Sequence, residues 1–509
     1  MVCEQGLALP RSGQYGLALC FPGPYSLGMA HLGFQSLIRL LFETPGWWGD
    51  RFFADTGSRS VVFRLPLGNF HVVAFSLSFE LDIFPFLIML KEGGIPLYTK
   101  DRKREHPFVL LGGPVVTLNP EIVAPFADAL VIGEAEAVLP RILQTWSTLR
   151  SRGASREEMW QALAHIPGVY VPELVVPLYK GGVIKEFAAE MPLPVYRQWT
   201  DVSAFETRTF VYTPLSHFQR TALVELNRGC RYRCRFCAGR CIYAPLRHRP
   251  LDFVLGMIEN VLPWQPEKIG LVGSDVLSHP EIKDILRWII RLGKKVTLAS
   301  LVGRDLYQEG DFLVLFRQGG LETVTLAPET GDEVLRRFLG KGLSNDEWID
   351  LVEECLKRGF SRVKLYFMLG KPNRASCEAD IAFLRRLVER TQSPNRLFVS
   401  YSFLVPKPHT PLENLEVTPF REWKREKEIF ERELRKLKVP FSGESPRRAW
   451  VELILARGDR LLASCLPELL EGEKFLSLPA WRKIFARLFR DADEWPRLPW
   501  REGQKPWQV

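Results

Sequence analysis

The chain has 509 residues, of which 46% are hydrophobic and 25% are charged, a composition typical of a globular protein with about three domains. Lysine and arginine outnumber aspartate and glutamate by 68 to 59, but the excess is spread along the chain, so a nucleic-acid partner is not favoured. No run of about 18 apolar residues predicts a membrane span, and the first residues lack the features of a secretion signal. We therefore expect a cytoplasmic protein.

Short apolar runs alternate with helical stretches from the start to about residue 150, which predicts an α/β domain built on a parallel sheet. Residues 151–215 follow as a connector, with a helix near 155–164 and then proline-rich short strands. The expected strands of the first domain are 15–21, 71–76, 107–111 and 128–132, and its expected helices are 27–43, 82–92 and 134–150.

Three of these expected strands end in loops rich in glycine or proline. Ligands of open α/β sheets bind at the carboxyl ends of strands, where glycine lets a ligand approach the backbone. Plain turn geometry would require glycine at the same places, so both interpretations stay open. The candidate cofactor-binding residues of these loops are Tyr25, Ser26, Gly112, Gly113, Pro114, Gly133 and Glu134.

A short expected strand at 221–227 leads into a loop that carries Cys230, Cys234 and Cys237 at C-x3-C-x2-C spacing. Soft thiolate ligands select iron-sulfur clusters and zinc, and three thiolates bind three irons of a four-iron, four-sulfur (4Fe-4S) cluster. The fourth iron then has no protein ligand and is open to a chelating molecule. We therefore interpret the three cysteines as metal ligands and as the catalytic centre.

Cys241 leaves other interpretations open. With it, the loop approaches the four-cysteine run of ferredoxins, but the first gap is one residue too long and Ile242 stands where proline is expected. Zinc usually takes two separated pairs of ligands, and His248 is the only histidine nearby in the sequence. Disulfides need an oxidising compartment, whereas the remaining cysteines are scattered singly.

The cysteine spacing, with Phe236 just before the third cysteine, resembles that of radical S-adenosylmethionine (radical SAM) enzymes. In that superfamily the amino and carboxylate groups of S-adenosylmethionine bind the open iron, and an electron from the cluster cleaves the sulfonium. Residues 23–41, 112–139 and 166–172 resemble the Rossmann-like, cobalamin-binding-type domain found ahead of many radical SAM domains. The resemblance implies a 4Fe-4S cluster, S-adenosylmethionine and an electron donor such as flavodoxin or ferredoxin.

From residue 221 to about 405, six strand-helix units follow one another. Six such units are the partial (β/α)6 barrel that the resemblance implies, and in such barrels the chemistry gathers at the carboxyl ends of the strands. The expected strands are 221–227, 268–273, 295–300, 321–327, 361–369 and 396–404, and the expected helices are 251–263, 280–293, 304–318, 345–358 and 376–391.

Polar residues follow these expected strands, and the resemblance implies that they bind S-adenosylmethionine. Asp275, in the run Gly273-Ser274-Asp275, is expected to accept the ammonium of the methionine moiety. Ser300 and Arg304 are expected to meet the ribose and the methionine carboxylate.

The later strand ends carry further candidates. Glu329 is expected to bind the ammonium or a ribose hydroxyl, although the start of a helix also favours an acidic residue without any ligand. Gly370-Lys371-Pro372 stands where relatives commonly have Gly-Leu-Pro, so Gly370 and Pro372 are expected at the cofactor and Lys371 is a departure. Phe236 is expected at the same site.

Four more residues are pocket candidates. Lys364 and Tyr366 alternate on one strand and therefore share a face, which either lines the barrel or lies on the surface. Lys407 and His409 lie in the proline-rich segment 403–415, which resembles the segment that closes the barrel in relatives. The helix 417–438 is charged throughout, which predicts a solvated outer helix within a small helical C-terminal region. The expected division is 1–150, 151–215, 216–415 and 416–509.

The N-terminal domain lacks the D-x-H-x-x-G loop that supplies a histidine to cobalt in many cobalamin proteins; its histidines are His31, His71 and His106. Either cobalamin binds without a histidine lower ligand, or the fold is retained without the cofactor. The sequence therefore favours a radical SAM enzyme, with cobalamin-dependent methyl transfer to an unactivated or aromatic carbon of a small-molecule or peptide substrate.

Two alternatives remain at this stage. One is a cobalamin-independent radical rearrangement, cyclisation or methylthiolation. Methylthiolation usually requires a second cluster with three cysteines of its own, and the N-terminal half offers only Cys3 and Cys20. The other is a non-catalytic iron-sulfur or nucleic-acid-binding protein.

Overall fold

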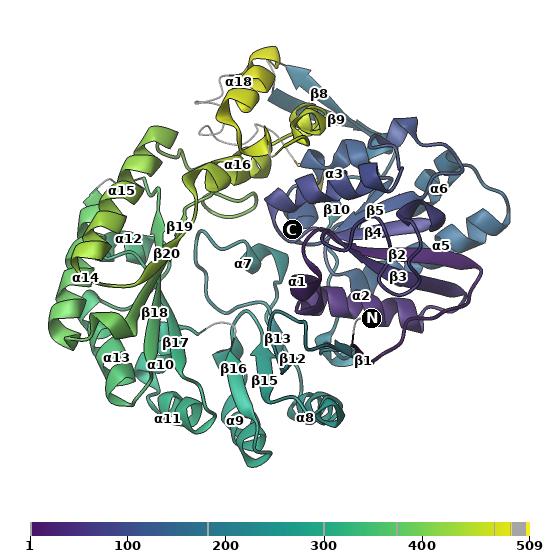
Figure 1. Cartoon of the computed structure of the whole chain (residues 1–509). Coiled ribbons are helices and arrows are strands. Elements are labelled where there is room, and N and C mark those ends of the chain that lie inside the picture. The colour runs from purple at the N-terminus through teal and green to yellow at the C-terminus, as the bar shows by residue number, and fades with distance from the viewer. Residues whose placement is uncertain are drawn as a thin grey trace. The chain divides into compact units, whose positions relative to one another are not determined.

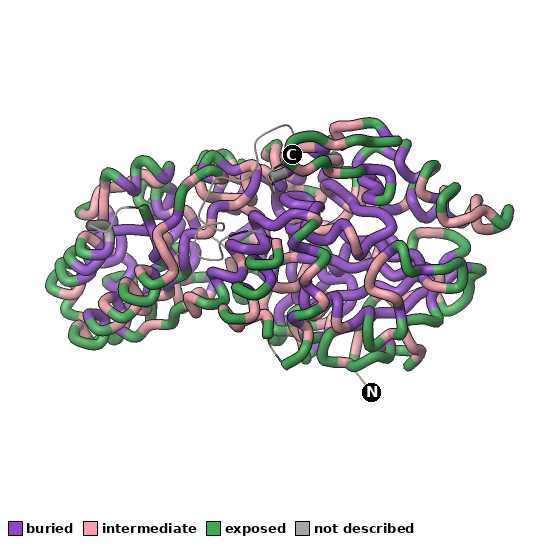
Figure 2. Tube along the Cα trace, turned by 90° about the horizontal axis from the view of Figure 1, so that it is seen from above, coloured by how far each residue is buried: buried purple, intermediate pink, exposed green. Residues whose placement is uncertain are grey.

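A computed structural model (Figure 1) describes residues 3–180, 183–298, 301–372, 375–472, 474–488, 490 and 505–509. The described residues of 1–220 and 454–509 form one compact unit, the N-terminal unit, and those of 221–453 form a second, the barrel unit. Buried residues gather in the interior of each unit (Figure 2). In the described part of the chain, no helix is both long and apolar enough to cross a membrane.

The N-terminal unit is built on a six-stranded sheet with the order β3-β2-β4-β5-β6-β7, in which the edge strand β7 is antiparallel to β6 and the other strands run parallel. β2 is buried at every residue, as in parallel sheets covered on both faces. This confirms the predicted α/β fold. The strands are β2 (Tyr15–Phe21), β3 (Trp47–Phe53), β4 (Val72–Ser76), β5 (Phe108–Gly112), β6 (Ala129–Val131) and β7 (Val169–Tyr170), and the main helices are α1 (Tyr25–Met29), α2 (Leu32–Glu43), α3 (Ile83–Glu92), α5 (Ala135–Ser151) and α6 (Arg156–Leu163).

The structure differs from the sequence predictions in two places around this sheet. The expected helix 27–43 is divided into α1 and α2, because His31 starts a new helix and its Nδ1 accepts a hydrogen bond from the amide of Phe34 at 3.3 Å. β3 was not predicted, because its sequence WWGDRFF lacks a β-branched pattern and contains a glycine. That glycine, Gly49, packs against β2 so closely that an added Cβ would lie 2.3 Å from the carbonyl oxygen of Leu17.

The C-terminal helix α17 (Arg460–Ala463) packs within the N-terminal unit. Arg460 pairs with the buried carboxylate of Glu121 at 2.9 Å, and the Asn119 amide donates to the carbonyl oxygens of Ala456 and Gly458 at 3.2 and 2.9 Å. The shorter elements of this unit are the hairpin β8 (Val175–Lys180) and β9 (Val183–Ala189), the pairs β1 (Gln5–Gly6) with β11 (Val211–Tyr212) and β10 (Val195–Tyr196) with β21 (Trp507–Gln508), and the helix α18 (Leu478–Arg487).

The barrel unit contains the six expected strands, all parallel to their neighbours, in two hydrogen-bonded groups. The first is β12 (Thr221–Glu225), β15 (Lys268–Val272) and β16 (Lys295–Leu298); the second is β17 (Thr323–Glu329), β18 (Arg362–Leu369) and β19 (Leu397–Phe403), extended by β20 (Phe441–Gly443). The helices are α8 (Leu251–Glu259), α9 (Ile282–Arg291), α10 (Gly303–Gln308), α11 (Asp311–Gln318), α12 (Glu333–Phe338), α13 (Asn345–Lys357), α14 (Ala375–Thr391), α15 (Phe420–Lys436) and α16 (Pro446–Ala456).

Two predicted helices of this unit differ in the structure. The expected helix 304–318 is divided into α10 and α11, with Gly310 at the start of the second. The helix predicted to be solvated, α15, is amphipathic: Trp423, Phe430 and Leu434 are buried on one side. Phe430 packs against Phe367 of β18 with ring centroids 5.9 Å apart, so α15 belongs to the outer helical layer that covers the strands.

Candidate functional site

The three motif cysteines lie on a loop that follows β12. β13 (Asn227–Arg228) pairs antiparallel with β14 (Arg247–His248), and α7 (Gly239–Ile242) lies between them. Gly229 begins the loop at φ +83°, and an added Cβ would lie 2.6 Å from the carbonyl oxygen of Pro245. Glycine is therefore required there both by the left-handed backbone and by the close approach of the returning chain.

The motif cysteines are free thiols, each partly exposed. Burial raises the pKa of the Cys230 thiol to about 11, and the nearby Asp275, Cys234 and Cys237 act in the same direction. No group of three or more His, Cys, Asp or Glu side chains among the described residues is arranged around a single ion. A cubic cluster does not need such an arrangement, because each cysteine binds a different iron, so this donor set fits a 4Fe-4S cluster.

Cys241 is placed differently from the motif cysteines. Its thiol donates a hydrogen bond to the carbonyl oxygen of His409 at 3.1 Å, and His409 has a left-handed backbone with φ +64°. The contact joins α7 to the 403–415 segment. In that segment Lys407 pairs with Glu452 of α16 at 2.6 Å, so the ammonium of this pocket candidate already has a counter-ion.

Two aspartates hold the first half of the cysteine loop. Arg231 pairs with Asp275 at 3.1 Å and with Asp305 at 2.6 Å, and the hydroxyl of Tyr232 also donates to Asp305. Asp275 follows β15 and Asp305 lies in α10, so the loop is fixed to two strand-helix connections. Arg231, Tyr232 and Asp305 were not predicted, because these contacts join residues that are far apart in the sequence.

The carboxylate of Asp275 is buried and keeps one oxygen without a partner. Oδ2 accepts from the amide of Arg231 at 3.4 Å, whereas Oδ1 is buried and has no hydrogen-bond partner among the described residues. A buried acceptor without a partner is costly, so Oδ1 suits a donor on a ligand. The amide of Asn227 fixes the Asp275 carbonyl at 2.6 Å, and Gly273 makes room for Asn227, since an added Cβ would lie 2.3 Å from Asn227 Oδ1.

Ser274 is half-buried. Ser300, the expected ribose contact, lies outside the described residues.

Glu329 ends β17 with φ +66°, and its carboxylate pairs with Lys341 at 3.0 Å. Burial lowers the pKa of Lys341, but the neighbouring Glu329 and Cys234 outweigh burial and raise it. The start of α12 is capped by Asp332, whose side chain accepts from two backbone amides, so Glu329 does not act as the helix cap. The Lys341 ammonium lies 5.8 Å from the ring centre of Phe236.

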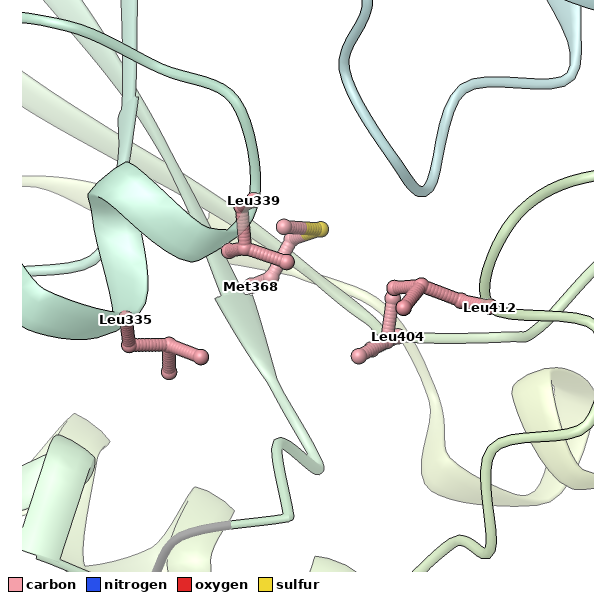
Figure 3. Close-up of a cluster of buried hydrophobic side chains, with 5 residues drawn as sticks. All are labelled: Leu335, Leu339, Met368, Leu404 and Leu412. Carbon is pink, nitrogen blue, oxygen red and sulfur yellow. The ribbon is translucent and has the colours of Figure 1, made fainter.

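Phe236 packs against a small hydrophobic cluster of the barrel unit. Figure 3 shows the buried members of that cluster. This packing attaches the cysteine loop, one residue before Cys237, to α12, β18 and the 403–415 segment. The role shown for Phe236 is therefore packing, while its expected place at the cofactor stays a prediction. The buried members of the cluster are Leu335, Leu339, Met368, Leu404 and Leu412.

A cavity of about 450 Å³ lies beside the cysteine loop. Its wall at Gly340 approaches the loop so closely that an added Cβ would lie 3.1 Å from the Cα of Cys234. Arg304 lines the cavity, and its guanidinium lies 5.8 Å from the ring centre of Tyr232. The charged residues that line the cavity are Arg304, Glu333, Arg337, Lys341 and Glu347.

Asp380 of α14 joins the loops that follow β17 and β18. It accepts from the Thr330 hydroxyl at 2.7 Å, the Gly331 amide at 2.6 Å and the Lys371 ammonium at 2.5 Å. The side chains of Lys371 and Asp380 are fully buried. Lys371, which departs from the pattern of relatives, therefore has a structural role in the core.

Gly370 and Pro372, on either side of Lys371, were expected at the cofactor. Gly370 has φ +71°, and an added Cβ would lie 2.9 Å from the ring of Trp423. Pro372 is exposed.

On β18, Lys364 and Tyr366 share one face, as expected, with the Lys364 ammonium 4.7 Å from the Tyr366 ring centre. Phe367 on the other face packs against α14 and α15, so this pair points away from the helical layer.

Most strand-end residues of the N-terminal sheet are already engaged by the chain itself. Gly113 has φ +100°, and an added Cβ would lie 2.6 Å from the carbonyl oxygen of Leu77. Gly133 has φ +117°, and an added Cβ would lie 2.1 Å from the carbonyl oxygen of Gln198. Glu134 accepts hydrogen bonds from the amide and the hydroxyl of Thr200, each at 3.0 Å.

The first loop of that edge is also packed. The Tyr25 hydroxyl donates to Glu4 at 2.6 Å, and the Ser26 carbonyl accepts from the amide of His217 at 2.9 Å. Gly112 is different, because an added Cβ would meet nothing closer than 3.6 Å. Pro114 begins the short helix α4 (Pro114–Leu118).

The same edge exposes two large apolar side chains. Leu27, after β2, is 43% exposed and Phe79, after β4, is 69% exposed, and both follow neighbouring strands.

The Nδ1 atoms of His31, His71 and His106 accept hydrogen bonds from backbone amides at 3.3, 2.9 and 2.8 Å. An acceptor Nδ1 leaves the proton of a neutral imidazole on Nε2, so these rings are not poised to bind a metal through Nε2.

Two family models match the chain: one described as radical SAM proteins, N-terminal, over residues 33–172, and one described as the radical SAM superfamily, over residues 224–384. An uncharacterized protein of Methanocaldococcus jannaschii is 26% identical over 88% of this chain and 90% of its own length. An uncharacterized methyltransferase of Pyrococcus horikoshii is 24% identical over 56% of this chain and 59% of its own. A solved structure of the methyltransferase TsrM from Kitasatospora setae, with cobalamin and a 4Fe-4S cluster bound, is 15% identical, covers 79% of this chain and 74% of that one, and has a TM-score of 0.49.

Proposed function

The chain belongs to the radical SAM superfamily of enzymes, and on this premise we propose that it binds a 4Fe-4S cluster through Cys230, Cys234 and Cys237 and uses S-adenosylmethionine. The observation that carries the proposal is the set of three free thiols on one loop, beside the buried and unpartnered Oδ1 of Asp275. The cluster would supply the electron that breaks a carbon–sulfur bond of S-adenosylmethionine.

The chain's own residues would bind and orient that molecule. Oδ1 of Asp275 would accept the methionine ammonium, which gives the buried oxygen the partner it lacks. Arg304, at the cavity of about 450 Å³, would bind the methionine carboxylate. Arg231 and Tyr232, held by Asp305, would keep the cysteine loop in one conformation while the ligand binds.

For the reaction we propose methyl transfer assisted by cobalamin, held at the carboxyl edge of the N-terminal sheet. The support is the exposed apolar pair Leu27 and Phe79 at that edge, together with the name of the P. horikoshii relative. Because His31, His71 and His106 accept backbone hydrogen bonds through Nδ1, the cobalt would have no histidine ligand from these rings. The acceptor would be an unactivated or aromatic carbon of a small molecule or peptide.

An acidic electron-donor protein such as flavodoxin or ferredoxin would reduce the cluster. Arg233 and Arg235 flank Cys234 and are exposed, so this part of the loop carries positive charge at the surface. Opposite charges speed association at low salt, and the rate of reduction should therefore fall as ionic strength rises.

The first experiment is anaerobic reconstitution of the full chain. It should give one 4Fe-4S cluster, and S-adenosylmethionine should change the electron paramagnetic resonance spectrum of the reduced protein. Cys234→Ala should abolish the cluster, whereas the matched variant Cys241→Ala should keep it. An equal loss in Cys241→Ala would favour a four-cysteine electron carrier, and formation of neither 5'-deoxyadenosine nor S-adenosylhomocysteine would contradict the enzyme proposal.

The second experiment concerns cobalamin and uses protein produced with supplied hydroxocobalamin. Stoichiometric corrinoid in the absorption spectrum, without nitrogen hyperfine splitting from a histidine, would support the methyltransferase. Protein that retains no corrinoid would instead favour a cobalamin-independent radical rearrangement or cyclisation.

A further inference from the structure

A second cavity, of about 200 Å³, lies in the N-terminal unit at the amino ends of β4 and β5. It is bounded by the loops that enter these strands, by the end of α5 and by the start of α6. This places it at the opposite end of the strands from the edge proposed to hold cobalamin. The residues of this basic pocket used below are Arg104, Trp146, Arg150 and Arg156.

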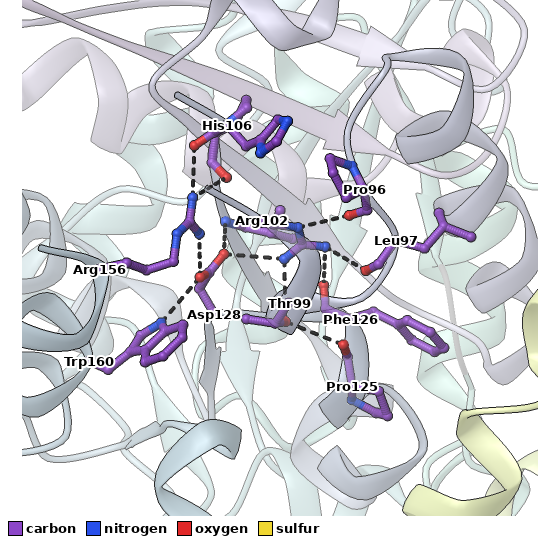
Figure 4. A network of polar contacts seen from close by, with 12 residues as sticks. Pro96, Leu97, Thr99, Arg102, His106, Pro125, Phe126, Asp128, Arg156 and Trp160 are labelled. Atoms are coloured by element: carbon purple, nitrogen blue, oxygen red, sulfur yellow. Dashed lines mark hydrogen bonds and ion pairs between the residues drawn. The ribbon is translucent and has the colours of Figure 1, made fainter. Parts of the chain in front are cut away.

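The acidic group behind the pocket is already shared between two arginines (Figure 4). Asp128 pairs with Arg156 at 2.5 Å and with Arg102 at 3.2 Å, and it also accepts from the indole of Trp160 at 3.1 Å. One carboxylate therefore balances two guanidinium groups. Arg156 also donates to the carbonyl oxygen of His106 at 2.8 Å, which fixes it at the pocket wall.

Arg104 and Arg150 line the pocket without a counter-ion. Neither guanidinium group forms an ion pair or a hydrogen bond with the described residues, and the one acidic residue of the described lining, Glu105, is exposed. Burial lowers the pKa of Arg150, and the nearby charges of Arg104 and Arg156 lower it further. The pocket lining thus carries Arg104, Arg150 and Arg156 against the single carboxylate of Glu105, and a site of net positive charge attracts an anion.

Trp146 contributes a separate observation. Its side chain lines the pocket, the residue is only 3% exposed, and its indole Nε1 is buried without a hydrogen-bond partner in the described part of the chain. Buried donors in proteins normally have a partner, so an indole N–H that has none among the described residues is available to an acceptor on a ligand. An anion with several oxygens would accept from the indole and from the guanidinium groups together.

We propose that the basic pocket binds a phosphate group, carried by inorganic phosphate or by a small phosphomonoester. Two unpaired guanidinium groups match a doubly charged anion better than a single carboxylate. Sites for drug-sized ligands usually measure about 300–1,000 Å³, so this smaller volume accepts a phosphate with at most a short organic group. Bound phosphate would join the loop before β5, through Arg104, to the end of α5, through Arg150.

Isothermal titration of the full chain with inorganic phosphate, and separately with glycerol 3-phosphate, tests the proposal at fixed ionic strength. We expect a dissociation constant below about 1 mM for at least one of them. Tighter binding of glycerol 3-phosphate would assign the pocket to a phosphomonoester, and tighter binding of phosphate would assign it to the inorganic ion. Absence of binding by both would overturn the proposal.

Three variants identify the site. Arg150→Gln should weaken binding at least about ten-fold, because it removes a charged donor. Trp146→Phe keeps the ring and removes the indole N–H, and it should weaken binding about five-fold. Arg141→Gln is the matched control, since Arg141 is exposed on the same helix and lies outside the pocket lining.

The control separates the pocket from general charge effects. Binding that Arg141→Gln weakens as much as Arg150→Gln does would come from net charge and would overturn the proposal. Far-ultraviolet circular dichroism and the thermal midpoint of each variant should match those of the unchanged protein, which shows that the fold is kept. The titration needs no cluster, so its outcome is independent of the proposed radical chemistry.

Discussion

The loops that follow the strands contain similar residue types in the two units, but the space beside those residues is occupied differently. In the N-terminal sheet, the space that Gly113 and Gly133 leave is filled by the backbone of Leu77 and Gln198. In the barrel unit, Asp275 keeps a buried oxygen to which no described residue donates, beside the cysteine loop. A glycine at a strand end is thus compatible with an edge closed by the chain itself, whereas a buried acceptor without a partner indicates a place for a ligand.

The largest effect should come from Lys371→Met, which tests how the barrel unit holds its strand-end loops. The variant leaves the carboxylate of Asp380 buried without its cation, and breaking such a pair costs about 3–5 kcal/mol of unfolding free energy. Urea unfolding should show this loss. Combining Lys371→Met with Asp380→Asn should recover part of it, and no recovery would mean that the charge is not the cause.

Gly133→Ala tests whether the N-terminal edge is closed by its own chain. The added methyl group would meet the carbonyl oxygen of Gln198 and would need a positive φ, and together these should cost about 2–4 kcal/mol of unfolding free energy. Gly112→Ala is the control and should stay within about 1 kcal/mol, because nothing crowds that position. A Gly133→Ala protein of unchanged stability that retains less corrinoid would instead make Gly133 part of a ligand cradle.

Asp275→Asn tests whether the buried carboxylate of the barrel unit binds a ligand. Losing the charged acceptor should weaken binding of S-adenosylmethionine to the reconstituted protein about thirty-fold, corresponding to about 2 kcal/mol. Asp305→Asn disturbs the same loop but keeps Oδ1 of Asp275, so equilibrium binding should fall by less than about five-fold. Equal losses would show that loop order, and not the ammonium contact, is what Asp275 provides.

The smallest effect concerns pH. Burial raises the pKa of Glu426, which accepts from the Gly370 amide at 2.8 Å, from 4.5 to about 7. The folded protein then holds a proton that the unfolded chain releases, so stability falls as the pH rises from 4.5 to about 7. Glu426→Gln stays neutral and should therefore be more stable than the unchanged protein near pH 8, with little difference between the two near pH 5. Thermal midpoints at both pH values would show this, and an equal gain at both would contradict it.

The sequence was sufficient for features that depend on local pattern. The six barrel strands follow from apolar runs, and the cysteine loop follows from a spacing that is read directly. The division of the helix at His31 could not be predicted, because it depends on a side chain that bonds to the backbone locally and breaks no apolar pattern. β3 was missed because its sequence WWGDRFF lacks the β-branched residues typical of a strand and contains a glycine.

The partners of the site residues were the least predictable part. Nothing near Glu329 in the sequence indicates Lys341, and nothing near Asp275 indicates Arg231, because both ion pairs form only when separate loops meet. The same holds for Gln198, which occupies the space beside Gly133. A pattern of residue types can therefore nominate a strand-end residue, but folding decides whether a ligand or the chain itself takes the adjacent space.

The return of α17 to the N-terminal unit has a consequence for synthesis on the ribosome. The barrel unit, 221–453, is an insertion between two parts of one folded body, so the first 220 residues leave the ribosome long before their remaining partners. Until Arg460 is made, the carboxylate of Glu121 lacks the cation that pairs with it in the finished protein. We therefore expect the inserted unit to complete its folding first, and chains that stop near residue 453 to be targets of proteases.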